Sequence, residues 1–256
     1  RCGFFKLMQE LRHADLVHSH LLKADALTAV CAELSGRAGR LVSGKHNDER
    51  ALLNPWVSRA HGVLGNIPRR TIALSDHVAR FVEEHGRVRP DRIRRVYYGI
   101  DPTPFEAAGA ARDAHRVAVR RAFGFGPLDP VFLCVARFAP QKAHDVLLEA
   151  FARAREAVGE RAKPRLLLVG DDPFGDGRER AEVWAKERDL GDDCVVCGIR
   201  RDVPRLMAAS DAFVMSSLWE GLGLVFLEAM ATGLPVVGSR VSAIPEVVSD
   251  GNTGLL

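Results

Sequence analysis

Four charged side chains stand where they could hold a sugar linked through two phosphates. Arg137 closes the apolar run VFLCVAR, and Lys142 stands at the start of the next helical stretch. A cation at a helix N-terminus interacts unfavourably with the helix dipole unless an anion binds beside it, so this position indicates an anion-binding site. Glu220 and Glu228 follow later in the chain, and ionised carboxylates accept paired hydrogen bonds from vicinal hydroxyls. Together these residue types predict a pocket for a nucleotide-diphosphate sugar.

The two acids flank the start of an apolar helix expected over residues 224–232, in the stretch WEGLGLVFLEAMATGLPVV. Gly223 and the uncapped N–H groups of such a helix would let phosphate oxygens approach the backbone. We therefore expect Glu228, whose neighbours in the sequence are apolar, to hold a ribose diol, and Glu220 to hold hydroxyls of the sugar beyond the diphosphate. The alternatives are an acid stabilised by the helix dipole at Glu220, an internal ion pair at Glu228 and a solvated lysine at Lys142.

Short β-branched runs alternate with longer amphipathic ones, which is typical of parallel sheets joined by crossover helices. Residues 101–130 contain no strand, and we interpret them as a linker and one leading helix between two α/β domains, 1–105 and 106–256. Ligands of open α/β sheets bind at the carboxyl ends of the strands, where every charged residue named above stands. The expected strands are 14–19, 40–44, 71–75, 93–99, 131–137, 165–170, 194–198, 211–217 and 234–239, with helices including 24–34, 76–86 and 145–158.

Composition narrows the classes of protein to consider. The 256 residues are 47% hydrophobic and 27% charged, with a net charge of +3, which gives no indication of nucleic-acid binding. Arginines cluster in RVRPDRIRR, 87–95, either as a solvated face or as a surface for peripheral contact with an anionic membrane. No run is apolar enough to span a membrane, and five scattered cysteines favour the reducing cytoplasm. The CVVC motif, 194–197, is interpreted as core packing because its two sulfurs would lie on opposite strand faces.

Histidines follow two of the expected strands. His18 and His20 alternate along one strand and therefore share a face, whereas His46 follows another strand in SGKHNDER. A metal site is the alternative for the His18 and His20 pair, but no third ligand with suitable spacing is evident. We expect His18 to pack or hydrogen-bond within the sheet, His46 to line an acceptor side, and no metal to be bound.

Several segments resemble the family-4 retaining glycosyltransferases with the GT-B fold. EGLGLVFLEAMATGLPVVGSRVSAIPEVVSDGNTGLL is similar to the signature region of that family, including two glutamates separated by seven residues. VARFAPQKAHDVLLEAFARA resembles its diphosphate segment, whereas DLVHSH, TIALSDHVARFV and VYYGIDPTPF resemble its acceptor-side half. The similarity extends over essentially the whole chain and implies two Rossmann-like domains with parallel sheets.

The resemblance assigns roles to individual residues of a retaining glycosyltransferase, with no metal or other cofactor. Arg137 and Lys142 would contact the donor diphosphate, and His20 would lie near the transferred sugar. The acceptor would be a saccharide or a lipid-linked intermediate. Gly198, Ile199 and Arg200 would lie beside the nucleobase, and Glu228 would contact the ribose. Glu220 and the backbone of Gly221, Leu222 and Gly223 would hold the transferred sugar, and Leu224 completes the donor-binding set. The implied catalytic set is His20, Glu220, Arg137 and Lys142.

Some positions depart from the family pattern. Tyr98 replaces the asparagine of the usual NGID segment, and Ser242 and Ala243 replace a glycine pair before IPE. No strand with a glycine-rich loop precedes ADLVHSH, so we expect an internal fragment with an incomplete N-terminal domain. A sugar-nucleotide epimerase of the same fold and a non-catalytic nucleotide-sugar binding module stay open as alternatives. A glycosidase using Glu220 and Glu228 is disfavoured because it would leave Arg137 and Lys142 without a role.

Overall fold

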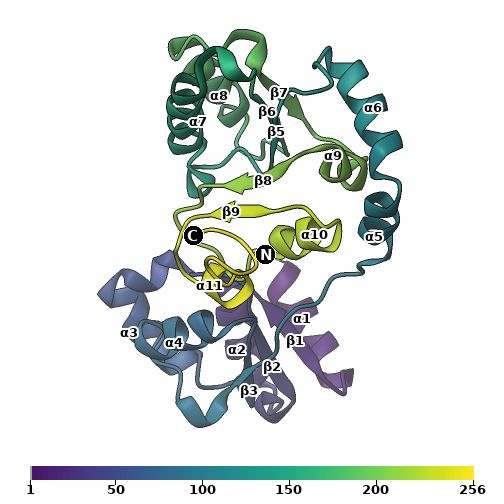
Figure 1. Cartoon of the computed structure of the whole chain (residues 1–256). Helices are drawn as coiled ribbons and strands as arrows, with labels where there is room; N and C mark the ends of the chain where they lie inside the picture. The colour runs from purple at the N-terminus through teal and green to yellow at the C-terminus, as the bar shows by residue number, and fades with distance from the viewer. Residues whose placement is uncertain (1) are drawn as a thin grey trace. The chain divides into compact units, whose positions relative to one another are not determined.

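The computed structural model describes residues 2–256 and divides into two compact units. The first contains residues 2–98 together with Glu220–Leu222, and the second contains Gly99–Trp219 and Gly223–Leu256. Each unit has its own parallel sheet, so the expected α/β class with parallel sheets is confirmed (Figure 1).

The first unit contains a four-stranded parallel sheet in the order β1-β2-β3-β4. Successive strands are neighbours, and the chain passes through a helix between each of them, as parallel pairing requires. Helix α1 packs on α2, and the core lies between the sheet and the helices, with Val78 and Val82 fully buried. Its elements are α1 (Cys2–His13), β1 (Val17–His20), α2 (Leu22–Leu34), β2 (Leu41–Lys45), α3 (Pro55–Leu64), β3 (Arg70–Ala73), α4 (Asp76–Glu84) and β4 (Ile93–Arg95).

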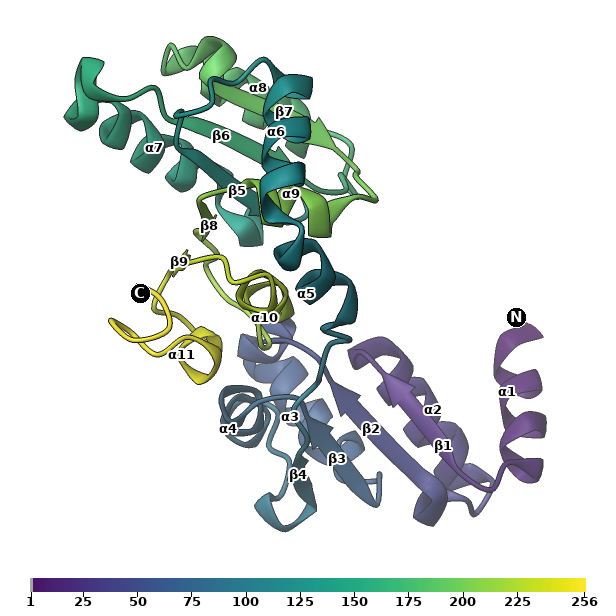
Figure 2. The same cartoon turned by 45° about the vertical axis from the view of Figure 1, so that its right-hand side comes forward.

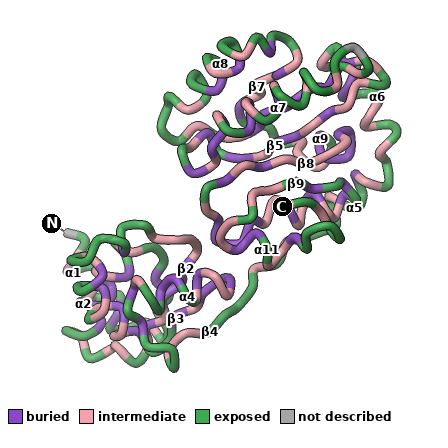
Figure 3. Tube along the Cα trace, turned by 60° about the vertical axis from the view of Figure 1, so that its left-hand side comes forward, coloured by how far each residue is buried: buried purple, intermediate pink, exposed green. Residues whose placement is uncertain are grey.

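The second unit contains a five-stranded parallel sheet in the order β7-β6-β5-β8-β9. Its elements are α5 (Thr103–Ala110), α6 (Arg112–Phe123), β5 (Val131–Val135), α7 (His144–Val158), β6 (Arg165–Val169), α8 (Gly177–Glu187), β7 (Cys194–Gly198), α9 (Val203–Ala209), β8 (Ala212–Met215), α10 (Leu224–Ala231), β9 (Val236–Gly238) and α11 (Ile244–Val247). Strand β6 is buried along its whole length, as Figure 3 shows for the centre of this sheet.

The strand order of the second unit reverses between β5 and β8. From β5 the chain continues outward to β6 and β7, then returns through α9 to the other side of β5 and continues to β9. Right-handed crossovers consequently place α7 and α8 on one face and α9 and α10 on the other. Figure 2 shows this layering, and α5 and α6 pack against α9. The carboxyl ends of β5 and β8 therefore form the switch point at which ligands bind in sheets of this kind.

All nine predicted strands are present, although most are shorter than predicted. Residues 101–130 contain two helices instead of one, because the alanine-rich segment after Pro102 forms α5 and α6 follows it directly. Helix α1 was not predicted. The compact units divide between Tyr98 and Gly99, and α5, which follows, packs on α9 and α10.

Candidate functional site

Hydrogen bonds join the segment that carries Lys142 to the segment that follows β8. The Ser216 hydroxyl donates to the Lys142 carbonyl at 3.1 Å and to the Ala143 carbonyl at 2.8 Å. The Gln141 side chain donates to the Trp219 carbonyl at 2.6 Å, and the Leu218 N–H donates to the Gln141 carbonyl at 2.8 Å. The backbone that presents Lys142 is therefore fixed against the backbone that leads to Glu220.

The loop after β5 also lies against the ends of β6 and β7. The Phe138 N–H donates to the Asp171 carbonyl at 2.7 Å, and the Gly170 N–H donates to the Gly198 carbonyl at 2.9 Å. A Cβ atom at Gly170 would collide with the Ala136 carbonyl, so this close approach needs glycine. The structure thus brings Arg137, which follows Ala136, to the same sheet edge as Gly198.

The predicted donor-site charges differ in their surroundings. Arg137 is exposed, and its guanidinium has no hydrogen bond or ion pair with the residues that the structure describes. Lys142 is half-buried. Glu228 is also half-buried and not enclosed on every side as its apolar neighbours suggested, because α10 is partly exposed around most of its circumference. Burial raises the pKa of Glu228, and within residues 2–256 it has no ion pair.

Helix α10 begins directly after Gly223, and the Phe226 N–H of its first turn donates to the Gly223 carbonyl at 2.9 Å. Within residues 2–256, no side chain caps this end of the helix. The preceding residues Glu220–Leu222 group with the first unit, and Glu220 is buried. At the end of β7, Ile199 is exposed and Arg200 forms a paired contact with Asp202 at 2.8 Å.

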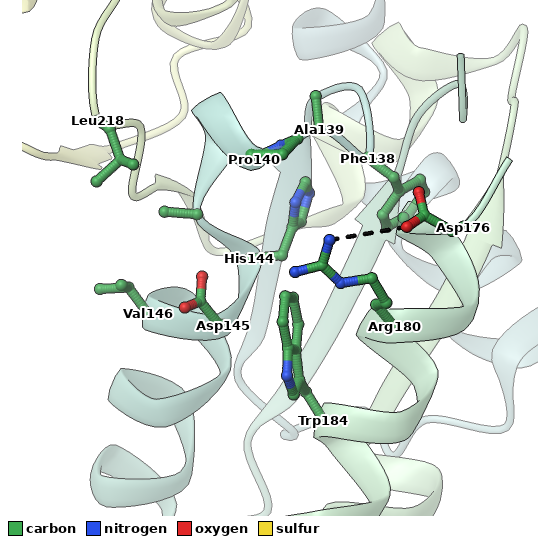
Figure 4. A pocket seen from close by; sticks show the side chains of 12 residues that line it. Phe138, Ala139, Pro140, His144, Asp145, Val146, Asp176, Arg180, Trp184 and Leu218 are labelled. Carbon is green, nitrogen blue, oxygen red and sulfur yellow. Dashed lines mark ion pairs between the residues drawn. The ribbon is translucent and has the colours of Figure 1, made fainter. Parts of the chain in front are cut away.

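The segment between Arg137 and Lys142 borders a cavity of about 180 Å³ between the first turns of α7 and α8. Figure 4 shows the rings of His144 and Trp184 and the guanidinium of Arg180 in its lining. His144 is buried and stacks on Phe138 with ring centroids 4.8 Å apart. Burial, with a smaller effect of the nearby Lys142 charge, lowers the pKa of His144 to about 4. The cavity wall therefore contains a neutral imidazole at neutral pH.

In the first unit, His20 and His46 meet at the carboxyl end of the sheet. His20 Nδ1 lies 2.6 Å from His46 Nε2, and the Tyr98 hydroxyl lies 2.6 Å from His46 Nδ1. His18 shares the face of His20, as predicted, with ring centroids 4.1 Å apart. However, its side chain is exposed and does not pack inside the sheet. The contact between His46 and Tyr98, which joins residues 52 positions apart, could not be foreseen from the sequence.

A buried ionic cluster lies directly beside His46 and was also missed. Lys45 Nζ lies 2.6 Å from Asp25 Oδ2, 3.0 Å from Glu49 Oε2 and 3.2 Å from His61 Nε2. His61 Nδ1 donates to the Gly86 carbonyl, so its Nε2 carries the lone pair and accepts from the ammonium group. All three N–H bonds of Lys45 therefore have acceptors, and the cluster fixes the backbone that carries His46.

Most of the arginines in residues 87–95 form hydrogen bonds or ion pairs with other residues of the first unit. Arg92 donates to the carbonyls of Asn66 and Pro68, and Arg95 pairs with Asp76 at 2.7 Å. Arg89 pairs with Asp91 at 3.0 Å. These contacts reduce the charge available to a membrane surface and favour the interpretation as a solvated face.

Three other features of the described residues bear on the predictions from the sequence. No helix within residues 2–256 is both long enough and apolar enough to span a membrane. Across the same residues, no three His, Cys, Asp or Glu side chains are arranged to hold a metal ion. Both cysteines of the CVVC motif are free thiols, and burial raises the pKa of Cys194 to about 12, which makes it an unreactive core residue.

Two α/β units with parallel sheets, the second with loop-borne charges at its switch point, define a protein of the GT-B class. The solved structure of Anabaena Alr3699/HepE in complex with UDP-glucose matches 99% of this chain and 67% of its own, with a TM-score of 0.86 and 25% identity. The model of the glycosyl transferases group 1 matches residues 129–256, and the Glycosyltransferase Family 4 model matches residues 3–104. The chain therefore belongs to the glycosyl transferases group 1 family.

Curated relatives share this similarity along most of the chain. N-acetyl-alpha-D-glucosaminyl L-malate synthase of Bacillus anthracis is 30% identical over 251 residues, covering 94% of this chain and 61% of the relative. D-inositol 3-phosphate glycosyltransferase 2 of Catenulispora acidiphila is 31% identical over 276 residues, covering 97% and 60%. The chain thus spans about three-fifths of the length of these relatives.

Proposed function

We propose that the complete protein transfers a sugar from a nucleotide-diphosphate donor to a hydroxyl of a saccharide or lipid-linked acceptor, with retention at the anomeric carbon. The proposal rests on the hydrogen bonds that connect the Lys142 segment to the segment after β8, at the switch point of the second sheet. This connection places a cation next to the chain that leads into the uncapped start of α10.

The diphosphate would bind between these positive groups. Arg137, which is exposed and has no ion pair within residues 2–256, would contact phosphoryl oxygens together with Lys142. N–H groups at the start of α10 would add hydrogen bonds. As the bond between sugar and phosphate breaks, negative charge gathers on the departing diphosphate. Fixed cations and N–H groups would stabilise that charge without a metal.

The acids would recognise the sugar rings of the donor. Glu228, half-buried within α10, would accept hydrogen bonds from the ribose diol, and desolvation of its carboxylate would be offset by these donors. Glu220 and the backbone of Gly221, Leu222, Gly223 and Leu224 would hold the transferred sugar. Gly198, Ile199 and Arg200 would lie beside the nucleobase, and His20 and His46 would face the sugar and the acceptor.

The comparisons support this class of reaction without fixing its substrates. The Anabaena structure contains UDP-glucose, and the two curated relatives are named for L-malate and D-inositol 3-phosphate. UDP-glucose is a nucleotide sugar, and L-malate and D-inositol 3-phosphate both carry hydroxyl groups. The proposed reaction would take place in the cytoplasm, because nucleotide sugars are its substrates.

The test compares Lys142→Ala with Lys186→Ala in the complete protein. Lys186 is exposed on α8 and serves as the matched loss of one lysine. After a panel of nucleotide sugars has identified the donor by thermal stabilisation, Lys142→Ala should lower turnover about 10²- to 10³-fold while Lys186→Ala leaves it unchanged. Near-normal turnover of Lys142→Ala would remove that residue from the site. Donor binding without transfer would favour the binding module, and isomerisation of the donor alone would favour the epimerase.

A further inference from the structure

Three side chains of the first unit form a continuous hydrogen-bonded chain that ends at His20. The Tyr98 hydroxyl contacts His46 Nδ1 at 2.6 Å, and His46 Nε2 contacts His20 Nδ1 at 2.6 Å. The rings of His20 and His46 are stacked with centroids 4.8 Å apart. Both ring nitrogens of His46 are therefore occupied, and His20 has only Nε2 left for another partner.

The backbone of β2 makes room for this arrangement. Gly44 pairs with His20 in the parallel register of β1 and β2. A Cβ atom at Gly44 would lie 2.8 Å from His20 Nδ1 and 2.8 Å from His18 Nε2. Any other residue type would therefore displace one ring or both, and the absence of a side chain at this position is what lets His20 reach His46.

The direction of the hydrogen bonds follows from the chemistry of the phenol. A phenolic O–H is a good donor, whereas its oxygen is a weaker acceptor because its lone pair is delocalised into the ring. Each neutral imidazole has one N–H and one lone pair. If Tyr98 donates to Nδ1 of His46, the proton of His46 must lie on Nε2 and is donated to Nδ1 of His20. His20 then carries its own proton on Nε2.

We propose that Tyr98 and His46 are positioning residues that hold His20 as an Nε2–H hydrogen-bond donor toward a substrate oxygen. The inference rests on the proposed function for the identity of that oxygen, a hydroxyl of the transferred sugar or the acceptor. The Nε2–H group of His20 would donate a hydrogen bond to a lone pair of that oxygen. His20 would therefore not be the base that removes the acceptor proton.

Burial and neighbouring charges favour the neutral forms of His46 and Tyr98. Burial lowers the pKa of His46, and repulsion from His20 and His18 lowers it further, while Asp25 and Glu49 partly oppose these effects. Burial likewise raises the pKa of the Tyr98 hydroxyl. Lys45 directly precedes His46 in the sequence, and its ammonium group is paired with the carboxylates of Asp25 and Glu49. A neutral phenol at Tyr98 and a neutral imidazole at His46 are what the proposed hydrogen-bond direction requires.

The first experiment measures the imidazole tautomers by ¹⁵N nuclear magnetic resonance on the substrate-free protein at neutral pH. We expect His20 and His46 to be Nε2–H tautomers in the unmodified protein. Tyr98→Phe should raise the Nδ1–H fraction of both rings, because the donor to His46 is lost. Tyr97→Phe removes a hydroxyl from the adjacent residue, which contacts Asp76 instead, and should change neither ring. An Nδ1–H tautomer of His20 in the unmodified protein would overturn the proposal.

The second experiment is a double-mutant cycle on turnover of the complete protein. Loss of one hydrogen bond of the chain in Tyr98→Phe should lower kcat/KM roughly two- to tenfold. The same substitution should have no further effect in the His20→Ala background, because Tyr98 would act only through that ring. Equal effects in both backgrounds would contradict the proposal. If the protein transfers no sugar, the proposed function fails. The tautomer measurement still decides whether Tyr98 and His46 orient His20.

Discussion

At the residue scale, the first unit depends on one lysine that is almost completely buried. Lys45 is 1% exposed, and its ammonium group is held by Asp25, Glu49 and His61. Asp25 also accepts hydrogen bonds from Ser19 and Ser43, so every polar group of the cluster has a partner. A buried ion pair of this kind contributes little relative to apolar packing, but the loss of one member leaves a charge without compensation.

We therefore predict that Lys45→Met lowers the free energy of unfolding by about 3–5 kcal/mol. The buried Asp25 and the half-buried Glu49 would both lose the ammonium group that they contact, although methionine fills a similar volume. The measurement is equilibrium unfolding in urea, with Lys23→Met as the control because Lys23 is exposed and in no ion pair with the residues described. Adding Asp25→Asn to Lys45→Met should recover part of the loss. A loss below about 1 kcal/mol would show that the cluster relaxes or admits water.

The sequence indicated candidate charged residues more readily than their surroundings. Arg137 and Glu228 could be proposed because one follows a strand and the other interrupts an apolar helix, which are local signals. The partners of Lys45 and His46 lie outside the strand that carries Lys45, so no local sequence pattern indicates them. The one available signal was Asp25 in the first turn of α2, at a position that faces the core. An acid there needs a buried cation, and Lys45 at the end of β2 is that cation.

At the element scale, Asp211 links three elements of the second unit. Its carboxylate lies 2.7 Å from the Arg120 guanidinium of α6 and accepts the Val131 N–H at the start of β5 at 2.8 Å. Arg116, one turn earlier on α6, contacts the other carboxylate oxygen. Because Asp211 directly precedes β8, a single side chain connects α6 to the two central strands β5 and β8.

Removing this carboxylate should destabilise the second unit. Arg120 is 4% exposed, so Asp211→Ala would leave a buried guanidinium that keeps only backbone carbonyl acceptors. We predict a loss of about 3 kcal/mol or more in the free energy of unfolding, measured by urea denaturation. Asp192→Ala removes an exposed aspartate from the same unit and should change stability by less than about 0.5 kcal/mol. Similar values for the two variants would contradict this view of Asp211.

The elements themselves were largely predictable, and the exceptions have physical reasons. Strands of a parallel sheet are buried on both faces and appear as continuous apolar runs such as RLLLV of β6, which is easy to recognise. Helix α5 is a short alanine- and glycine-containing segment whose stability comes from packing on α9 and α10. Its composition resembles a linker, and only the tertiary contacts distinguish the two.

At the scale of the whole molecule, several histidines are kept neutral by the fold. Burial is the largest cause of a lowered pKa at His46, His61 and His144, and it is strongest at His144. A lowered pKa means that the unfolded chain binds protons more tightly than the folded one. The stability from these groups is complete above the unfolded pKa of 6.5 and is lost as the pH falls below it.

His144 permits a specific test of this pH dependence. Its pKa falls from 6.5 to about 4 on folding, a difference that corresponds to about 3 kcal/mol, lost progressively between these two pH values. His144→Phe keeps an aromatic ring against Phe138 but cannot be protonated. We predict that urea unfolding of this variant weakens less between pH 6.5 and about pH 4 than that of the unmodified protein. Some pH dependence should persist through His18, His46 and His61.

The control, His13→Phe at an exposed position of α1, should keep the full pH dependence. Parallel pH profiles for His144→Phe and the unmodified protein would mean that the folded protein accommodates a charged His144, with the cavity beside it admitting the water needed to solvate the imidazolium.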